Sequence, residues 1–410
     1  MTFSELDLHP ALLAALLAAL PATLHTPTRI QQLAIPVVLA GQDLLALAQT
    51  GSGKTLAFGL PLLQRLDPAS SLVQGLVVVP TRELAMQVSA ALQGMADALG
   101  LRILTLCGGV AQERQQAELA LGPQLLVATP GRLRDLLTQQ VLGLDGLQQL
   151  VLDEADRLLE MGFWPDIQWL MNEMPAERQT LLFSATLPAE LNAFAHSLLT
   201  EPTRIEANPL NSLVNEIEER LYLVNKSSKV PALISLLKEQ AWPQVLVFIS
   251  ARDDADGVAR KLARAGIPVA ALHGEKEQAV REQALDDFKA GKVLVLVATD
   301  LMARGIHVEA LPVVINLDLP ASAPVYVHRI GRTARAGCEG LAISLVCHGE
   351  SDILAAIRTL TGRELPLGEL AGFPVTDLPA SGEGKRPPRD KQANRRTANK
   401  RSVKQFKGKV

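Results

Sequence analysis

Short apolar runs alternate with amphipathic, helix-like stretches along most of the chain. Runs of this length suit strands that are buried on both faces of a parallel sheet. Because strands that alternate with helices form parallel sheets covered on both faces, the pattern predicts an α/β fold. Nine runs are predicted to be strands: 43–48, 75–80, 124–128, 149–153, 180–184, 244–249, 268–272, 293–298 and 313–318.

One break in this alternation divides the chain. Residues 208–215 read Asn-Pro-Leu-Asn-Ser-Leu-Val-Asn, a composition typical of a linker. We therefore expect α/β domains at residues 1–207 and 215–362, a linker at 208–214 and a C-terminal extension at 363–410. A chain of 410 residues with 48% hydrophobic content is long enough to bury two cores.

A glycine-rich loop separates the first predicted strand from a helix-like segment. It resembles the phosphate-loop pattern, with Ala48 in place of the first glycine. Gly51 and Gly53 let the backbone wrap a phosphate, Lys54 reaches the outer phosphates and Thr55 ligates Mg²⁺. The ordinary alternative is a plain strand-to-helix turn, which the Lys-Thr pair disfavours. The residues expected to bind ATP here are Ala48, Gln49, Thr50, Gly51, Ser52, Gly53, Lys54 and Thr55.

Two adjacent carboxylates follow the predicted strand at 149–153. They open the string Asp153-Glu154-Ala155-Asp156, which is a weak signal alone because acidic residues are common at helix starts. In a chain that also carries a phosphate loop, the string predicts nucleotide hydrolysis. Asp153 would hold Mg²⁺, and Glu154 would orient or deprotonate the attacking water.

A cluster of arginines occupies the segment from His328 to Gly337. If the segment is helical, Arg332 and Arg335 share one face, and both would point at a γ-phosphate. Arginine fingers of this kind stabilise the charge that develops in phosphoryl transfer. A solvated basic helix face is the alternative.

In their order along the chain, these segments resemble the DEAD-box RNA helicases, over about residues 1–350. The resemblance implies two tandem RecA-like domains with a cleft between them, ATP and Mg²⁺ as cofactors, and single-stranded and duplex RNA as partners. It implies that Gln31 reads adenine, and that hydrolysis is coupled to strand separation by Asp156, Ser184, Thr186 and His328. It also implies RNA-backbone contacts from Pro80, Thr81, Arg82, Gly109, Thr129, Gly131, Arg132, Gln278, Arg281 and Thr299.

The chain departs from the pattern of this family at two places. Thr23-Leu24 replaces a glycine and an aromatic residue near the adenine-reading segment, so Phe3 is expected to pack nearby instead. His307 replaces an Asp that would contact the nucleotide from the second domain. An imidazole lacks the fixed negative charge, which predicts weaker or pH-sensitive coupling between the domains.

Charge is distributed unevenly between the tail and the rest of the chain. Residues 383–410 contain eleven Lys or Arg and two acidic residues, a net charge of +9, whereas the remainder carries −12. Such a segment cannot bury enough apolar surface to fold. We expect the chain to be disordered from about residue 381 and to act there as an electrostatic tether for RNA. A solubilising end is the alternative.

Other features narrow the class of protein. The three cysteines form no CxxC pair, and no metal-binding cluster is evident in the sequence. The apolar segment 10–21 is too short to span a membrane and lacks a basic start, so a cytoplasmic protein is expected. We also expect a monomer. Two other functions stay open: an RNA clamp that turns over slowly because His307 weakens the nucleotide contact of the second domain, and a DNA helicase. The sequence does not distinguish ribosomal particles from RNA-decay machinery as partners.

Overall fold

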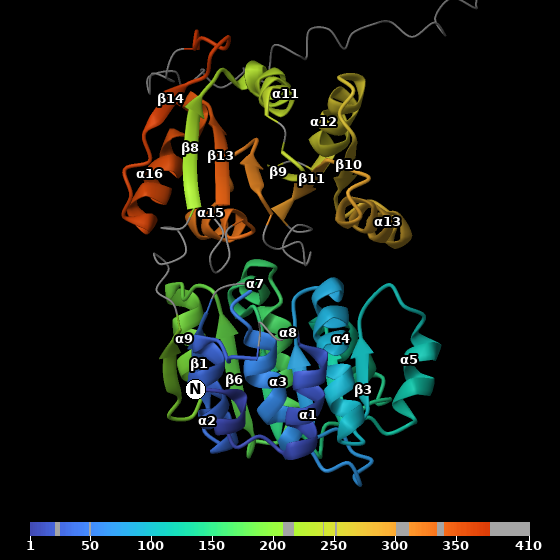
Figure 1. Ribbon diagram of the computed structural model, residues 1–410. Coiled ribbons are helices and arrows are strands. Elements are labelled where there is room, and N and C mark those ends of the chain that lie inside the picture. The colour runs from blue at the N-terminus through green and yellow to red at the C-terminus, as the bar shows by residue number, and fades with distance from the viewer. Residues whose placement is uncertain are drawn as a thin grey trace, which may run out of the picture.

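Two parallel sheets, one from each half of the chain, form the frame of the molecule, and Figure 1 shows them as two lobes, one above the other. The computed structural model describes residues 1–20, 25–48, 51–207, 217–240, 242–250, 252–300, 311–333 and 340–377. The positions expected at Thr23, Leu24, Gln49, Thr50, His307 and Arg335, the linker at 208–214 and the tail from residue 378 lie outside these ranges.

The first sheet has the strand order β3-β4-β2-β5-β6-β1-β7. Its strands are β1 (Leu44–Leu47), β2 (Gly75–Val78), β3 (Ile103–Leu106), β4 (Leu125–Ala128), β5 (Gln149–Leu152), β6 (Gln179–Ser184) and β7 (Thr203–Glu206). The helices around it are α1 (Pro10–Ala19), α2 (Arg29–Leu39), α3 (Lys54–Arg65), α4 (Arg82–Ala98), α5 (Gln112–Leu119), α6 (Pro130–Thr138), α7 (Ala155–Glu160), α8 (Trp164–Asn172) and α9 (Ala189–Leu198).

Side chains that alternate along these strands divide between two cores. Val77 packs with the apolar faces of α1 to α4, whereas Leu76 and Val78 pack with α6 to α9. All three are fully or almost fully buried. Because helices cover both faces, the strands read as continuous apolar runs, as the sequence pattern predicts.

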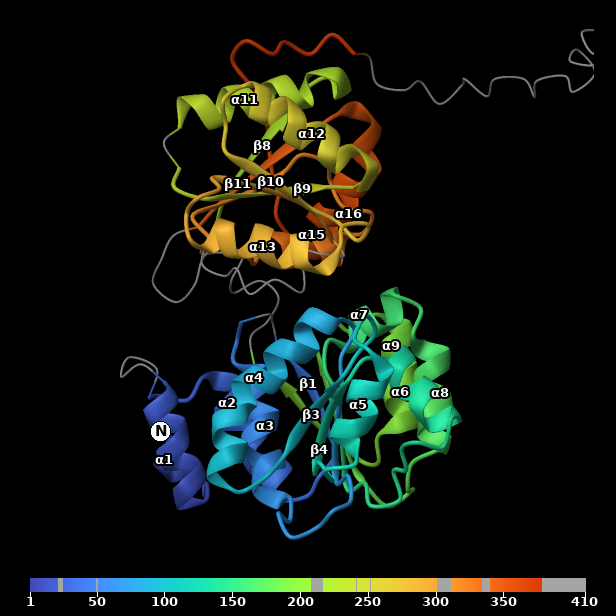
Figure 2. The ribbon, with the colours of Figure 1, turned by 90° about the vertical axis from the view of Figure 1, so that its right-hand side faces the viewer.

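The second sheet repeats this plan with the order β10-β11-β9-β12-β13-β8-β14. Its strands are β8 (Ile217–Leu223), β9 (Val245–Ile249), β10 (Val269–Leu272), β11 (Val295–Thr299), β12 (Val313–Asn316), β13 (Gly340–Val346) and β14 (Leu367–Glu369). In Figure 2, α11 (Lys229–Glu239) and α12 (Arg252–Arg264) cover one face, and α13 (Gln278–Lys289), α15 (Ala323–Ile330) and α16 (Ser351–Thr361) lie on the other.

The α/β fold and its parallel sheets are confirmed, and all nine predicted strands are present. Five strands were not predicted: β3, β7, β8, β13 and β14. The strands β7 and β14 form sheet edges, where exposed polar positions interrupt the apolar pattern. Since β14 pairs with β8, the second sheet extends past residue 362, the expected domain end.

The apolar segment near the N-terminus forms α1. Leu12 and Leu16 of this helix are fully buried and belong to the core that also contains α4. Within the described part of the chain, no helix has the length and apolar character needed to cross a membrane.

Candidate nucleotide site between the two sheets

The glycine-rich loop connects β1 to α3, where the sequence places it. Gly51 and Gly53 have φ angles of 85° and 92°, a left-handed conformation that favours glycine. A Cβ atom at Gly53 would lie 2.4 Å from Nε2 of Gln31, so the Gln31 side chain would have to move to admit a larger residue. The loop is therefore shaped to bring backbone close to a ligand at the start of α3.

Gln31 is buried against this loop. Its Nε2 donates a hydrogen bond to the Gly53 carbonyl at 3.1 Å, and its Oε1 accepts one from the Thr28 backbone N–H at 2.8 Å. Phe3 is also buried, in the core of the first domain. Adenine reading by Gln31 therefore stays a prediction, and its observed contact is with the phosphate loop.

Lys54 begins α3, and its side chain is almost completely buried. Among the described residues, its Nζ has no hydrogen-bond partner. A buried ammonium without a partner is costly, so this position suits an anionic group such as a phosphate. Thr55, the next residue of α3, supplies a hydroxyl at the same helix start.

Asp153 follows β5 and is 3% exposed. Burial raises its pKa to about 6, although Lys54 nearby acts in the opposite direction. A divalent cation beside Asp153 would compensate for the solvation that the carboxylate has lost. The chemistry of Asp153 and Thr55 thus fits the expected Mg²⁺.

Glu154 caps the start of α7 with a left-handed backbone, at φ 51° and ψ 51°. This conformation is unfavourable for a residue with a side chain. The Glu154 carbonyl accepts hydrogen bonds from the backbone N–H groups of Arg157 and Leu158 at 2.9 and 3.0 Å. The turn therefore holds Glu154 in place next to Asp153.

Asp156 is the centre of a buried polar network. Its Oδ2 accepts hydrogen bonds from the Thr186 backbone N–H at 3.0 Å and the Thr186 hydroxyl at 2.8 Å. Its own backbone N–H donates to Ser184 Oγ at 3.2 Å. Burial alone would raise the pKa of Asp156, but His328, Lys54 and these hydroxyl groups together lower it. Asp156 is therefore ionised at neutral pH.

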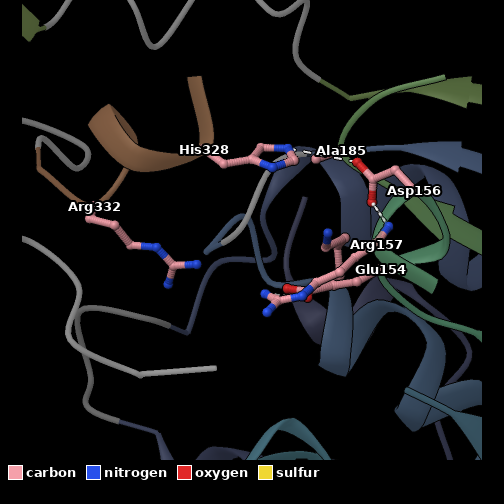
Figure 3. Close-up of a pocket in the computed structure, with 7 residues that line it drawn as sticks. Glu154, Asp156, Arg157, Ala185, His328 and Arg332 are labelled. Atoms are coloured by element: carbon pink, nitrogen blue, oxygen red, sulfur yellow. Dashed lines mark hydrogen bonds and ion pairs between the residues drawn. The ribbon is translucent and has the colours of Figure 1, made fainter. Parts of the chain in front are cut away.

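Side chains of the second domain complete the site. His328 lies on α15, and its Nε2 is 3.7 Å from Oδ2 of Asp156. Arg332, just beyond α15, points across the same pocket in Figure 3. The pocket is lined by Lys54, Glu154, Asp156, Arg157, Ala185, His328 and Arg332. Arg157 and Ala185 were not predicted, although both adjoin predicted residues.

The arginines of this segment differ in their surroundings. Arg329 is buried within its own domain, where its Nε and Nη2 bond to the carboxylate of Asp300 at 2.5 and 2.8 Å. Its Nη1 donates to the Asp318 carbonyl at 2.6 Å. Arg329 thus fastens α15 to the sheet, whereas Arg332 faces the other domain.

The residues of the first domain that are expected to contact RNA lie just after strands of its sheet, on loops and at the starts of α4 and α6. Arg82 Nη1 donates to the Gly109 carbonyl at 3.2 Å, and Arg132 Nη1 donates to the Val110 carbonyl at the same distance. These contacts bring the two arginines to one loop. The other expected residues of this domain follow β2 and β4: Pro80, Thr81, Thr129 and Gly131.

In the second domain, the expected residues are Gln278 and Arg281 on α13 and Thr299 at the end of β11. Arg281 Nη1 lies 3.0 Å from Oε1 of Glu83 on α4, in the first domain. This ion pair was not predicted from the sequence. It places the first turns of α4 and α13 next to each other, close to the residues of each domain that are expected to contact RNA.

Comparison with known proteins agrees with this geometry. The DEAD/DEAH box helicase family matches residues 28–194, and the helicase conserved C-terminal domain matches residues 228–337. The chain is 42% identical over 340 residues to the ATP-dependent RNA helicase CshA of Listeria monocytogenes, covering 82% of this chain but 65% of that protein. It is 44% identical over 327 residues to the ATP-dependent RNA helicase DbpA of Escherichia coli, covering 80% and 71%.

The placement of the two domains also resembles a solved structure. S. cerevisiae Dbp5 bound to RNA and ADP BeF3 matches with a TM-score of 0.81 at 30% identity, covering 90% of this chain and 95% of that one. A variant of the same yeast protein bound to Nup159, Gle1, IP6 and ADP gives 0.61 at similar coverage. At nearly equal coverage, the whole chain is therefore more similar to the RNA-bound form than to that complex.

Proposed function

Because the chain belongs to the DEAD-box family of ATP-dependent RNA helicases, we propose that it hydrolyses ATP when RNA binds and uses the closure of its two domains to unwind short RNA duplexes or remodel RNA–protein complexes. The pocket shared by the domains supports this most strongly, since Lys54 and Glu154 face Arg332 across it. Neither domain alone supplies all three side chains. Hydrolysis should therefore require closure.

The residues at this pocket divide the proposed reaction between them. The loop at Gly51–Thr55 and the Lys54 ammonium bind the phosphates of ATP. Thr55 and Asp153 would hold Mg²⁺, which neutralises charge on the phosphate oxygens when bound. Glu154 accepts a proton from the attacking water. Arg332, with Arg335 further along the chain, stabilises the charge that develops on the transferred phosphoryl group.

Coupling between the nucleotide and RNA would run through Asp156. Its carboxylate bonds to Thr186 within the first domain and lies near His328 of the second. That cross-domain approach is possible only when the domains are together. The ion pair between Arg281 and Glu83, near the residues proposed to bind RNA, likewise forms only when the two domains are together. We propose that RNA and ATP each favour the closed arrangement, so that each strengthens the binding of the other.

Closure gives the proposed unwinding a physical basis. The RNA-side loops form one continuous track across both domains only in the closed arrangement. A bound strand that follows this track is bent, and its partner strand is released. The similarity of the domain placement to RNA-bound yeast Dbp5 supports this view. Since one chain completes the nucleotide site, we also propose that the protein works as a monomer.

Turnover measured with different nucleic acids tests this function. We expect single-stranded and duplex RNA to stimulate ATP hydrolysis, DNA of the same sequence to have little effect, and short RNA duplexes to be separated in repeated, ATP-dependent turnovers. Lys54→Ala should remove all of these responses because phosphate binding is lost. Equal stimulation by DNA would indicate a DNA helicase. A single round of RNA capture without repeated strand release would indicate a clamp.

The clamp hypothesis depends on His307, which lies outside the residues that the structure describes. The described residues therefore do not favour a clamp over a helicase.

A further inference from the structure

Arg157 lines the nucleotide pocket, but the proposed reaction gives it no role. It lies on α7, the short helix that begins directly after Glu154. Its side chain is only 4% exposed, and that of Glu154 is 12% exposed. Burying a guanidinium is costly unless an opposite charge compensates. The burial of Arg157 at this place therefore calls for an explanation.

Arg157 forms an ion pair with the proposed base. Its Nη1 lies 3.8 Å from Oε2 of Glu154. The backbone N–H of Arg157 also donates to the Glu154 carbonyl at 2.9 Å and to Asp156 Oδ1 at 3.0 Å. Arg157 is thus tied to two of the three carboxylates of the site, to Asp156 through its backbone and to Glu154 through its charge.

The length of the ion pair matters for catalysis. A separation of 3.8 Å exceeds the range of a direct N–H···O hydrogen bond, so the attraction is mainly Coulombic. This contact therefore holds the carboxylate without occupying a lone pair, and a general base needs a lone pair for the water proton. Figure 3 shows the side chains of Arg157 and Glu154 close together, on the side of the pocket that faces Arg332.

We propose that Arg157 is a positioning residue, which holds the Glu154 carboxylate by charge in the orientation from which it accepts the proton of the attacking water. In that step the water oxygen bonds to the γ-phosphorus, the bond to the ADP oxygen breaks, and the water proton passes to Glu154. ADP and inorganic phosphate are the products. The inference rests on the proposed function, because it assumes that Glu154 is the base.

Substitutions at Arg157 alone and together with Glu154→Gln test this inference. With saturating RNA, Arg157→Gln should lower kcat by about 10- to 100-fold, since a misplaced catalytic group costs a rate factor of this size. KM for ATP should stay within about twofold. Arg157→Lys should recover most of the loss because it keeps the positive charge. In the Glu154→Gln background, Arg157→Gln should change the residual rate by less than about twofold.

Two measurements without turnover accompany the kinetics. The dissociation constant for a non-hydrolysable ATP analogue should be the same in Arg157→Gln as in the parent, and a cooperative thermal unfolding transition should show that the variant is folded. Arg204→Gln is a matched control, because Arg204 pairs with Glu206 at 2.6 Å on the exposed edge of the same domain. This control should leave kcat, analogue affinity and unfolding unchanged.

Three results would overturn the inference while leaving the proposed function intact. They are equal losses in Arg157→Gln and Arg157→Lys, a full additional loss in the Glu154→Gln background, and a weakening of analogue binding that matches the loss of kcat. The third would identify Arg157 as a direct phosphate ligand. A parent that RNA does not stimulate, or a Glu154→Gln variant with parental turnover, would overturn the proposed function and this inference together.

Discussion

Arg332→Gln is expected to slow RNA-stimulated ATP hydrolysis by about 10³- to 10⁵-fold, the range found when arginine fingers are lost in phosphoryl transfer. Arg332 is 3% exposed and reaches the pocket from the second domain. Its charge acts on the transferred phosphoryl group, where negative charge develops in the transition state. Binding of ATP in the ground state depends mainly on the first domain and should change far less.

Steady-state kinetics with saturating RNA check this expectation, with Arg220→Gln as the control. Arg220 belongs to the same domain but pairs with Glu218 on β8, where both side chains are about half exposed. The control should retain parental kcat and KM. If Arg332→Gln keeps kcat within about twofold of the parent, Arg332 is not an arginine finger in this protein.

Glu154→Gln is expected to lower kcat by about 10²- to 10⁴-fold, because the amide has the size of the acid but cannot take up the water proton. ATP and RNA should still bind, since the phosphate loop and the RNA-side loops are intact. The variant should therefore accumulate as a closed complex that releases RNA slowly. Hydrolysis and RNA dissociation rates, measured in the same preparation, separate these effects.

Glu160→Gln on the same helix is a suitable control, because this exposed residue lies outside the pocket. It should hydrolyse ATP and release RNA as the parent does. Slow hydrolysis in Glu154→Gln together with fast RNA release would contradict the proposed link between hydrolysis and reopening.

The sequence was informative where chemistry depends on a short local string. The glycines, Lys54 and Thr55 occupy fixed positions between a strand and a helix, and they fold where the pattern puts them. Pairings between distant segments were not predictable in this way. The ion pair of Glu83 with Arg281 depends on how the two domains meet, which no local pattern encodes.

The arginine-rich segment shows the same limit more sharply. In the sequence, nothing distinguishes Arg329 from Arg332, because both follow His328 within the same short arginine-rich segment. Only the fold separates them, because Arg329 is enclosed by Asp300 and Asp318 whereas Arg332 emerges at the pocket.

The pKa values of the two buried aspartates of the acidic string, Asp153 and Asp156, shift in opposite directions. The sequence of the string does not reveal this difference. The pKa of Asp153 rises to about 6 because burial outweighs the neighbouring Lys54. That of Asp156 is lowered, because His328, Lys54 and the surrounding hydroxyl groups outweigh its burial. Asp153 is thus suited to a bound cation, and Asp156 to a lasting negative charge at the domain junction.

The distance between the two domains, measured by fluorescence energy transfer, tests the central claim most directly. Arg114 in the first domain and Lys292 in the second are 75% and 70% exposed, so Arg114→Cys and Lys292→Cys provide sites for dyes. We expect the transfer efficiency to change to that of the closed form only when RNA and ADP BeF3 are both present. An efficiency that responds to neither ligand, in a preparation with active RNA-stimulated hydrolysis, would contradict the account.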